Sequence, residues 1–191
     1  AGCSSTKSTS TTETNAKQEA TESTKKDTLI YAGEAEDSIN PILSAHDELA
    51  TIIFSGLLKY DGNGKPVEDL AESYEFDKDS LTYTFHLRKD VKWHDGEAFN
   101  ADDVVFTYKE LTEDETLSSS VTSNYEDIKE IKEEDENTVK IVMKTYNAAM
   151  LGYFTMGIVP EHLLKGEDMN TTSFNQNPVG TGRYKFVSWE K

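Results

Sequence analysis

The sequence predicts an α+β fold, because hairpin patterns and helix patterns follow one another without a regular alternation of strand and helix. Residues 81–87 alternate apolar and polar side chains, which is the period of a half-buried strand. A polar run at residues 134–137 predicts the turn of a second hairpin, and Asn100 opens a strong helix pattern. No internal repeat indicates a solenoid or a propeller.

The first predicted elements are a short β-like run over residues 28–32 and a helix over residues 45–58. Ser44 and Asp47 form a capping pair at the start of this helix. Its apolar side chains fall on one face and are Leu49, Ile52, Ile53 and Leu57. The turn-forming sequence Asp-Gly-Asn-Gly at residues 61–64 ends the element.

The middle of the chain predicts two hairpins and a capped helix. Residues 73–76 and 81–87 form the first hairpin around a turn at residues 77–80. In the helix, Asn100 is the N-cap with Asp103 at N3, and Phe99 and Val104 occupy the positions of a hydrophobic staple. The buried face of this helix is predicted to contain Val104, Val105, Tyr108 and Leu111. One side of the second hairpin contains Val139, Ile141 and Met143.

The C-terminal region combines a turn with an apolar run. Gly180-Thr181-Gly182 predicts the turn, and the residues after it predict a new strand. The apolar residues of that strand are Tyr184, Phe186 and Val187. The sequence stops two residues after Trp189, so we interpret the chain as truncated.

Composition excludes several classes of protein. The 191 residues carry 19 Lys and Arg against 36 Asp and Glu, a formal charge of −17, which argues against nucleic acid as a partner. No apolar run approaches the roughly 18 residues of a membrane-spanning helix. Residues 4–28 include 13 Ser or Thr, so residues 1–27 are expected to form a disordered tether.

The single cysteine, Cys3, lies between small residues and this polar tether. The arrangement resembles the end of a bacterial lipoprotein signal peptide, in which the cysteine becomes the first mature residue and carries the lipid. The resemblance implies an extracytoplasmic protein, anchored by lipid to the outer face of the bacterial cell membrane. The alternative is an unpaired thiol in a disordered tail.

No catalytic set is visible, and no metal site or cofactor is predicted. His94 and Asp95 could form half of an acid–base pair, but a turn histidine is the favoured interpretation. The carboxylates of residues 133–136 could suggest a metal site, but a solvated hairpin tip is favoured. No nucleophile elbow or nucleotide loop is present.

Five blocks of residues resemble the signature of the family 5 bacterial extracellular solute-binding proteins, the peptide, dipeptide and nickel receptors of ABC importers. The blocks are Asp69–Phe76, Leu81–Gly96, Asn100–Tyr108, Val159–Leu164 and Asn177–Tyr184. The departure is Arg183, where the family usually has Pro.

The resemblance implies a periplasmic-binding-protein-like fold of the class II, or cluster C, type. Residues 28–44 would be the first part of lobe I, residues 45–158 an inserted accessory α+β domain, and residues 159–191 the return into lobe I. The second lobe would be missing.

The implied function is capture of extracellular oligopeptides or dipeptides for uptake, with a peptide ligand and the ABC transporter permeases as partners. The ligand-facing segment would consist of Ala32, Gly33, Glu34 and Ala35, with Tyr125 and Asn147 as weaker candidates. Binding of nickel or a metal chelate is an alternative within the family. A secreted hydrolase and a lipid-anchored adhesin are remote alternatives.

Overall fold

The computed structural model describes residues 27–33, 38–44 and 48–190, in two units that divide after Ala32. The expected tether falls almost wholly outside the described residues. In the first unit, residues 27–32 have no regular secondary structure and are exposed, with Ile30 88% exposed. The strand predicted over residues 28–32 is therefore wrong. Among the residues that the structure describes in this unit, none forms the neighbouring strand that ladder hydrogen bonds require.

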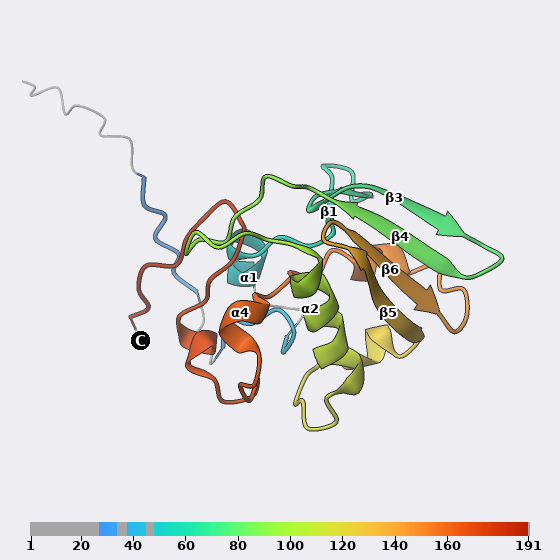
Figure 1. The fold of residues 1–191 in the computed structure, drawn as a ribbon. Helices are drawn as coiled ribbons and strands as arrows, with labels where there is room; N and C mark the ends of the chain where they lie inside the picture. The colour runs from blue at the N-terminus through green and yellow to red at the C-terminus, as the bar shows by residue number, and fades with distance from the viewer. Residues whose placement is uncertain (1–26, 34–37, 45–47, 191) are drawn as a thin grey trace, which may run out of the picture. The chain divides into compact units, whose positions relative to one another are not determined.

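The second unit, from Gly33 onward, is built on a four-stranded antiparallel sheet in the order β3-β4-β6-β5 (Figure 1). The strands are β3 (Ala71–Asp77), β4 (Thr82–Leu87), β5 (Ile128–Asp135) and β6 (Thr138–Met143). Helix α2 (Ala101–Glu113) lies against β5 and β6. The α+β prediction is confirmed.

Both predicted hairpins of this sheet are present. Tyr83, Phe85 and Leu87 of β4 are buried, as their alternation predicts, and Asp77 closes the first turn by accepting the amide of Asp79 at 2.9 Å. In the second hairpin Asp135 accepts the amide of Asn137 at 2.9 Å. The inward side of β6 contains the predicted Val139, Ile141 and Met143, all buried.

The helix that follows Asn100 begins as predicted. The Asn100 side chain accepts the amide of Asp102 at 2.9 Å, and the Asp103 carboxylate accepts the amide of Asn100 at 3.1 Å, which completes a capping box. One face residue differs from the prediction, because Val105 is only half-buried. Thr107 is fully buried instead, and its hydroxyl donates to the carbonyl of Asp103.

Helix α1 (Glu48–Ile53) is shorter than the predicted helix over residues 45–58. Its capping pair cannot be placed, since Asp47 lies outside the described residues. The helix stops because Gly56 bridges to Gly157, where a Cβ would meet backbone atoms of residue 155 at 2.5 Å. Leu58 then begins β1 (Leu58–Tyr60), which pairs with β2 (Pro66–Glu68) around the predicted turn at residues 61–64.

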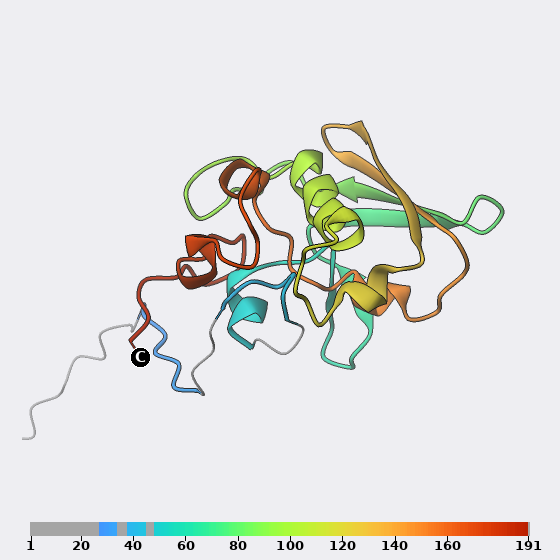
Figure 2. The same cartoon turned by 90° about the horizontal axis from the view of Figure 1, so that it is seen from below.

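The remaining elements are short and are η1 (Thr122–Tyr125), α3 (Met150–Tyr153), α4 (Glu161–Leu164) and η2 (Ser173–Gln176). They lie in different places, with α3 against β1 and η1 and with α4 against α2 (Figure 2). The strand predicted to include Tyr184, Phe186 and Val187 does not form, because residues 185–190 have no regular secondary structure. No described helix has the length and apolarity needed to cross a bilayer.

The core is aromatic where the sheet meets α2 and α3. The ring of Phe154 packs edge-on against Tyr83 at 5.1 Å and against Phe85 at 4.8 Å between centroids. Tyr108 of α2 packs against the same phenylalanine ring at 6.0 Å. These rings hold the helix on the sheet and so fix where its N-terminus lies.

The capping box predicts that truncation of the Asn100 side chain lowers the stability of the protein by a measurable amount. Asn100→Ala removes the side-chain acceptor of the Asp102 amide and should lower the free energy of unfolding by about 0.5–2 kcal/mol. Asn100→Asp retains a capping oxygen and serves as the matched control. Urea denaturation followed by circular dichroism measures both, and equal midpoints for wild type and Asn100→Ala would contradict this role of Asn100.

Candidate functional site

A network of polar groups, from side chains and from the backbone, surrounds Asp103 at the N-terminal end of α2. Asp103 is 4% exposed, and its Oδ2 accepts the indole N–H of Trp93 and the amide of Asn100, each at 3.1 Å. Its Oδ1 accepts the amide of Glu161, at the start of α4, at 2.9 Å. One carboxylate therefore joins the cap of its own helix and the nearby Trp93 to the start of α4, which lies 58 residues away in sequence.

Opposing effects act on the pKa of Asp103. Burial raises the pKa and is the largest effect, while the three hydrogen bonds and the nearby His162 oppose it. The net pKa lies above the usual value for an aspartate. The ionised form is thus held by directional donors in a site where desolvation disfavours it.

Asp95 pairs with His162 across the same network. Nε2 of His162 lies 2.7 Å from Oδ2 of Asp95, and the amide of Glu97 donates to Oδ1 at 3.2 Å. Partial burial would raise the pKa of Asp95, but these hydrogen bonds outweigh it and hold the pKa below its usual range. A depressed carboxyl pKa contributes stability that is present above the unfolded-state pKa and is lost as pH falls through the folded-state pKa.

The predicted alternative of a His94–Asp95 acid–base pair is not seen. Asp95 faces His162 instead, and the imidazole of His94 contacts the backbone of Gly180 and Gly182. The favoured interpretation, a turn histidine, fits its position in the loop before Gly96.

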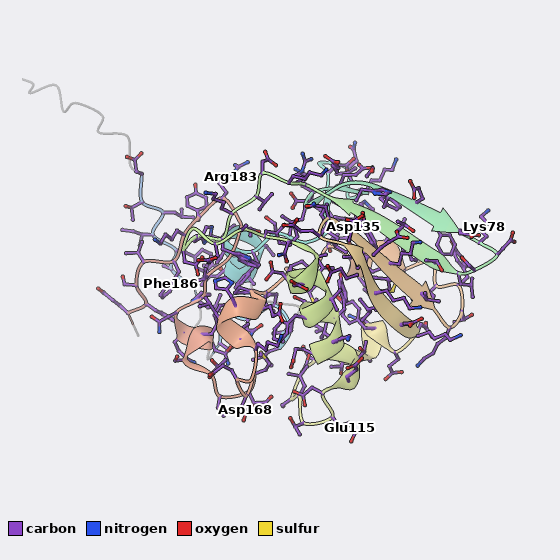
Figure 3. All side chains as sticks on the ribbon, in the orientation of Figure 1. Lys78, Glu115, Asp135, Asp168, Arg183 and Phe186 are labelled. Atoms are coloured by element: carbon purple, nitrogen blue, oxygen red, sulfur yellow. The ribbon has the colours of Figure 1, made fainter. Side chains whose placement is uncertain are left out.

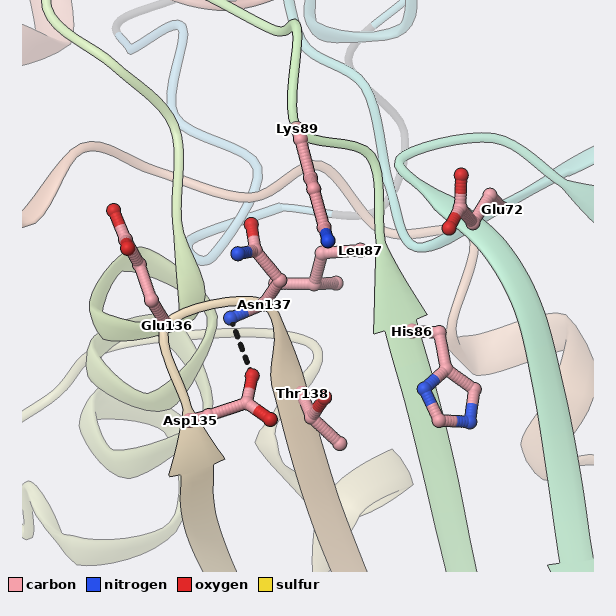
Figure 4. Close-up of a pocket in the computed structure, with 8 residues that line it drawn as sticks. All are labelled: Glu72, His86, Leu87, Lys89, Asp135, Glu136, Asn137 and Thr138. Atoms are coloured by element: carbon pink, nitrogen blue, oxygen red, sulfur yellow. Dashed lines mark hydrogen bonds between the residues drawn. The ribbon is translucent and has the colours of Figure 1, made fainter.

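A polar hollow of about 420 Å³ lies at the end of the sheet, where β4 ends and β6 begins (Figure 4). Its lining consists of Glu72, His86, Leu87, Lys89, Asp135, Glu136, Asn137 and Thr138. The β5–β6 turn that forms one wall is fixed by two backbone bonds, from Leu87 to Asn137 and from Ala101 to Glu136. Leu87 is the single apolar residue of the lining, whereas sites that enclose small solutes have mostly apolar walls. We assign this hollow no ligand.

The acidic run at residues 133–136 forms part of the β5–β6 hairpin, in agreement with its interpretation as a solvated hairpin tip. Glu134 pairs with Lys140 at 2.7 Å across the hairpin. The pKa of Glu133 is raised, first by a hydrogen bond shared with Asp102 and then by burial and neighbouring carboxylates. Among the described residues, no three His, Cys, Asp or Glu side chains gather in a way that could hold a metal ion.

The residues predicted to face a ligand are not brought together in the described part of the chain. Ala32 and Gly33 are exposed, and Glu34 and Ala35, like Cys3, lie outside the described residues. Tyr125 is 2% exposed, and its hydroxyl donates to the carbonyl of Tyr153 at 2.8 Å, so it packs in the core.

Asn147 is half-buried and donates to Asp127 at 3.2 Å while it accepts the amide of Ala149. A ligand-binding role for any of these six residues stays a prediction.

Sequence reasoning missed the contacts that organise the network. Asp95 and His162 are 67 residues apart, and Asp103 and Glu161 are 58 apart. Each partner lies inside one of the blocks that carry the family resemblance, so the blocks were a usable signal. Local patterns did not show which block contacts which.

Solved structures with a similar fold define the class of protein to which this chain belongs. NikZ from Campylobacter jejuni, solved in complex with Ni(L-His), superimposes with a TM-score of 0.79 at 44% identity, covering 82% of this chain and 32% of that one. The oligopeptide-binding protein AppA from Bacillus subtilis, solved with a nonapeptide, gives a TM-score of 0.75 at 29% identity with the same coverage. The fold is therefore that of part of a periplasmic binding protein.

Residues 65–191 match the model of the bacterial extracellular solute-binding proteins, family 5 Middle. The chain belongs to this family. The dipeptide-binding protein of Escherichia coli is 30% identical over 193 residues, which covers 86% of this chain and 36% of that protein. The chain spans about a third of the length of the curated relatives that it matches.

The Asp103 network predicts a strong effect of a nearly isosteric change. Asp103→Asn replaces one acceptor oxygen with an N–H₂ group that faces existing donors, so a buried donor is left unpaired. We expect the free energy of unfolding to fall by about 1–3 kcal/mol at neutral pH.

The matched control is Asp102→Asn, which removes the same charge from the neighbouring, exposed position. Chemical denaturation of both variants separates the loss of hydrogen bonding from the loss of charge. Equal stabilities for the two variants would show that the three donors to Asp103 contribute nothing.

Proposed function

We propose that the intact protein is the substrate-binding component of a bacterial ABC importer and captures extracellular oligopeptides or dipeptides for uptake. The observation that carries this proposal is the family match over residues 65–191, together with relatives whose names state peptide binding. Relatives of this chain are solute-binding proteins, so we propose capture without catalysis.

Capture would use main-chain contacts. An extended peptide can hydrogen-bond to exposed backbone while its side chains occupy hydrated pockets, which tolerates many sequences. In this chain we propose residues 32–35 for such contacts, and the two of them that the structure describes, Ala32 and Gly33, are exposed. The division into a tether (1–27), lobe I (28–44 and 159–191) and an accessory domain (45–158) is part of the same proposal.

A metal chelate is the second candidate solute, and a specific observation favours it. The structure at 44% identity is a complex with Ni(L-His). The solute in this second candidate would be a metal ion carried by a small-molecule chelator, as in that complex.

One experiment separates the two solutes. The intact protein, freed of co-purifying ligand by unfolding and refolding, is titrated by calorimetry with a mixture of di- to pentapeptides and with Ni(L-His). Peptide capture predicts a Kd near or below about 1 μM for peptides, equivalent to roughly −8.2 kcal/mol, and no heat from the nickel complex. Binding of the nickel complex alone would replace the first candidate with the second. Binding of neither would overturn both.

We further propose that Cys3 carries a lipid that anchors the protein to the outer face of the bacterial cell membrane, with the importer permeases as partners. Expression of the complete precursor with radiolabelled palmitate should label the protein, and Cys3→Ser should abolish the label and release the protein from the membrane fraction. Equal labelling of both forms would contradict the anchor.

A further inference from the structure

Residues 180–184 run along the C-terminal end of α1. The amide of Gly182 donates to the carbonyl of Ile53 at 2.7 Å, and the amide of Tyr184 donates to the carbonyl of Ile52 at 3.2 Å. Carbonyls in the last turn of a helix have no partner within the helix, and this segment supplies one to each. The approach requires glycine, because a Cβ at residue 182 would lie 2.5 Å from the carbonyl oxygen of Ile52.

His94 holds the same segment from the other side. Its amide donates to the carbonyl of Gly180 at 2.9 Å, and its Nδ1 accepts the amide of Gly180 at 3.3 Å. Its Nε2 lies 2.8 Å from the carbonyl oxygen of Gly182. Residues 180–184 are thus fixed between α1 and the loop that contains His94. Figure 3 labels Arg183 within this segment.

These contacts define the protonation state of the imidazole. The amide of Gly180 can only donate, so Nδ1 must present a lone pair. The carbonyl of Gly182 can only accept, so Nε2 must carry the hydrogen. The two contacts are satisfied together only by the neutral Nε2–H tautomer, since a cationic ring would place an N–H at Nδ1 against the N–H of Gly180.

We infer that His94 is a positioning residue that holds residues 180–184 on the end of α1, and that it does so only as the neutral imidazole. The inference does not depend on which solute the protein captures. It concerns where the chain runs after the Gly180-Thr181-Gly182 turn, because residues 180–184 form no strand with any other described residue.

A second histidine nearby faces a carboxylate and can keep its contact when protonated. His162 faces the carboxylate of Asp95 at 2.7 Å, a contact that a protonated ring strengthens. A protonated ring is therefore compatible with the His162 contact and incompatible with the Nδ1 contact of His94. Charged groups on the elements that meet here are Asp95 and Glu97 beside His94, Glu161 and His162 on α4, Glu48 on α1, and Arg183 and Lys185 on the segment itself.

The test is hydrogen–deuterium exchange of the intact protein, followed by mass spectrometry of the peptide that contains Gly182 and Tyr184. Exchange is compared at about pH 7.5 and about pH 5.5, across the range in which imidazoles charge, after correction with an unstructured reference peptide. In the wild type we expect protection of this peptide to fall roughly tenfold on acidification, while the peptide from α2 stays protected.

Two substitutions test the Nδ1 and Nε2 contacts of His94 separately. His94→Asn retains an acceptor near the position of Nδ1, and His94→Gln retains a donor near the position of Nε2. Each should exchange faster than the wild type at the higher pH and lose the fall on acidification. His162→Gln, which leaves His94 intact, should keep that fall.

Protection that is independent of pH in the wild type, or a fall that persists in both His94 variants, would overturn the inference. If both His94 variants were unfolded, faster exchange in the α2 peptide would reveal it. The comparison of the wild type with His162→Gln would then test the inference. If the fall in protection disappeared in His162→Gln, the pH dependence would belong to His162 and not to His94.

Discussion

The hydrogen bonds that the buried carboxylate of Asp103 accepts are the interaction on which the arrangement of this unit depends. The carboxylate receives donors from its own helix cap, from the indole of Trp93 and from the first residue of α4, all within 3.1 Å. A buried carboxylate without such donors would be costly, and its raised pKa shows that burial still weighs against the charge. The three donors are therefore coupled, since each one helps to retain the charge that holds the other two. This coupling fixes α2, the Trp93 loop and α4 relative to one another.

Much of the fold could be predicted from local sequence. The strand at residues 82–87 and the helix after Asn100 are specified by patterns that span only a few residues, an alternation in one case and a capping box in the other. Turns with Asp and Gly were equally predictable, because their side-chain hydrogen bonds reach only two to four residues along the chain. The functional class came from blocks of resemblance, and the site itself did not follow from local patterns.

The failures share a physical cause. Apolar runs at residues 28–32 and 184–187 look like strands, but a strand exists only where a neighbour accepts and donates its backbone bonds. The predicted helix over residues 45–58 ended early because the backbone at residues 155–157 packs directly against Gly56. The contacts of Asp95 with His162 and of Asp103 with Glu161 were missed for the same reason, since the two residues of each pair lie more than 50 residues apart. For the end of α1 and for the two carboxylates, a distant segment decided an outcome that the local pattern left open.

The two histidines of the network show that residue type alone does not define a role. His162 and His94 are the same residue in adjoining parts of one structure, yet one faces a carboxylate and the other faces a backbone amide. The carboxylate accepts a hydrogen bond from a neutral or a charged ring, whereas the amide requires a free lone pair, so a protonated ring fits one contact and not the other. The α4 contact and the contact with residues 180–184 therefore differ in their dependence on protons, although the loop of residues 93–96 takes part in both. For this reason the loop connects two regions of the protein whose rigidity need not change together.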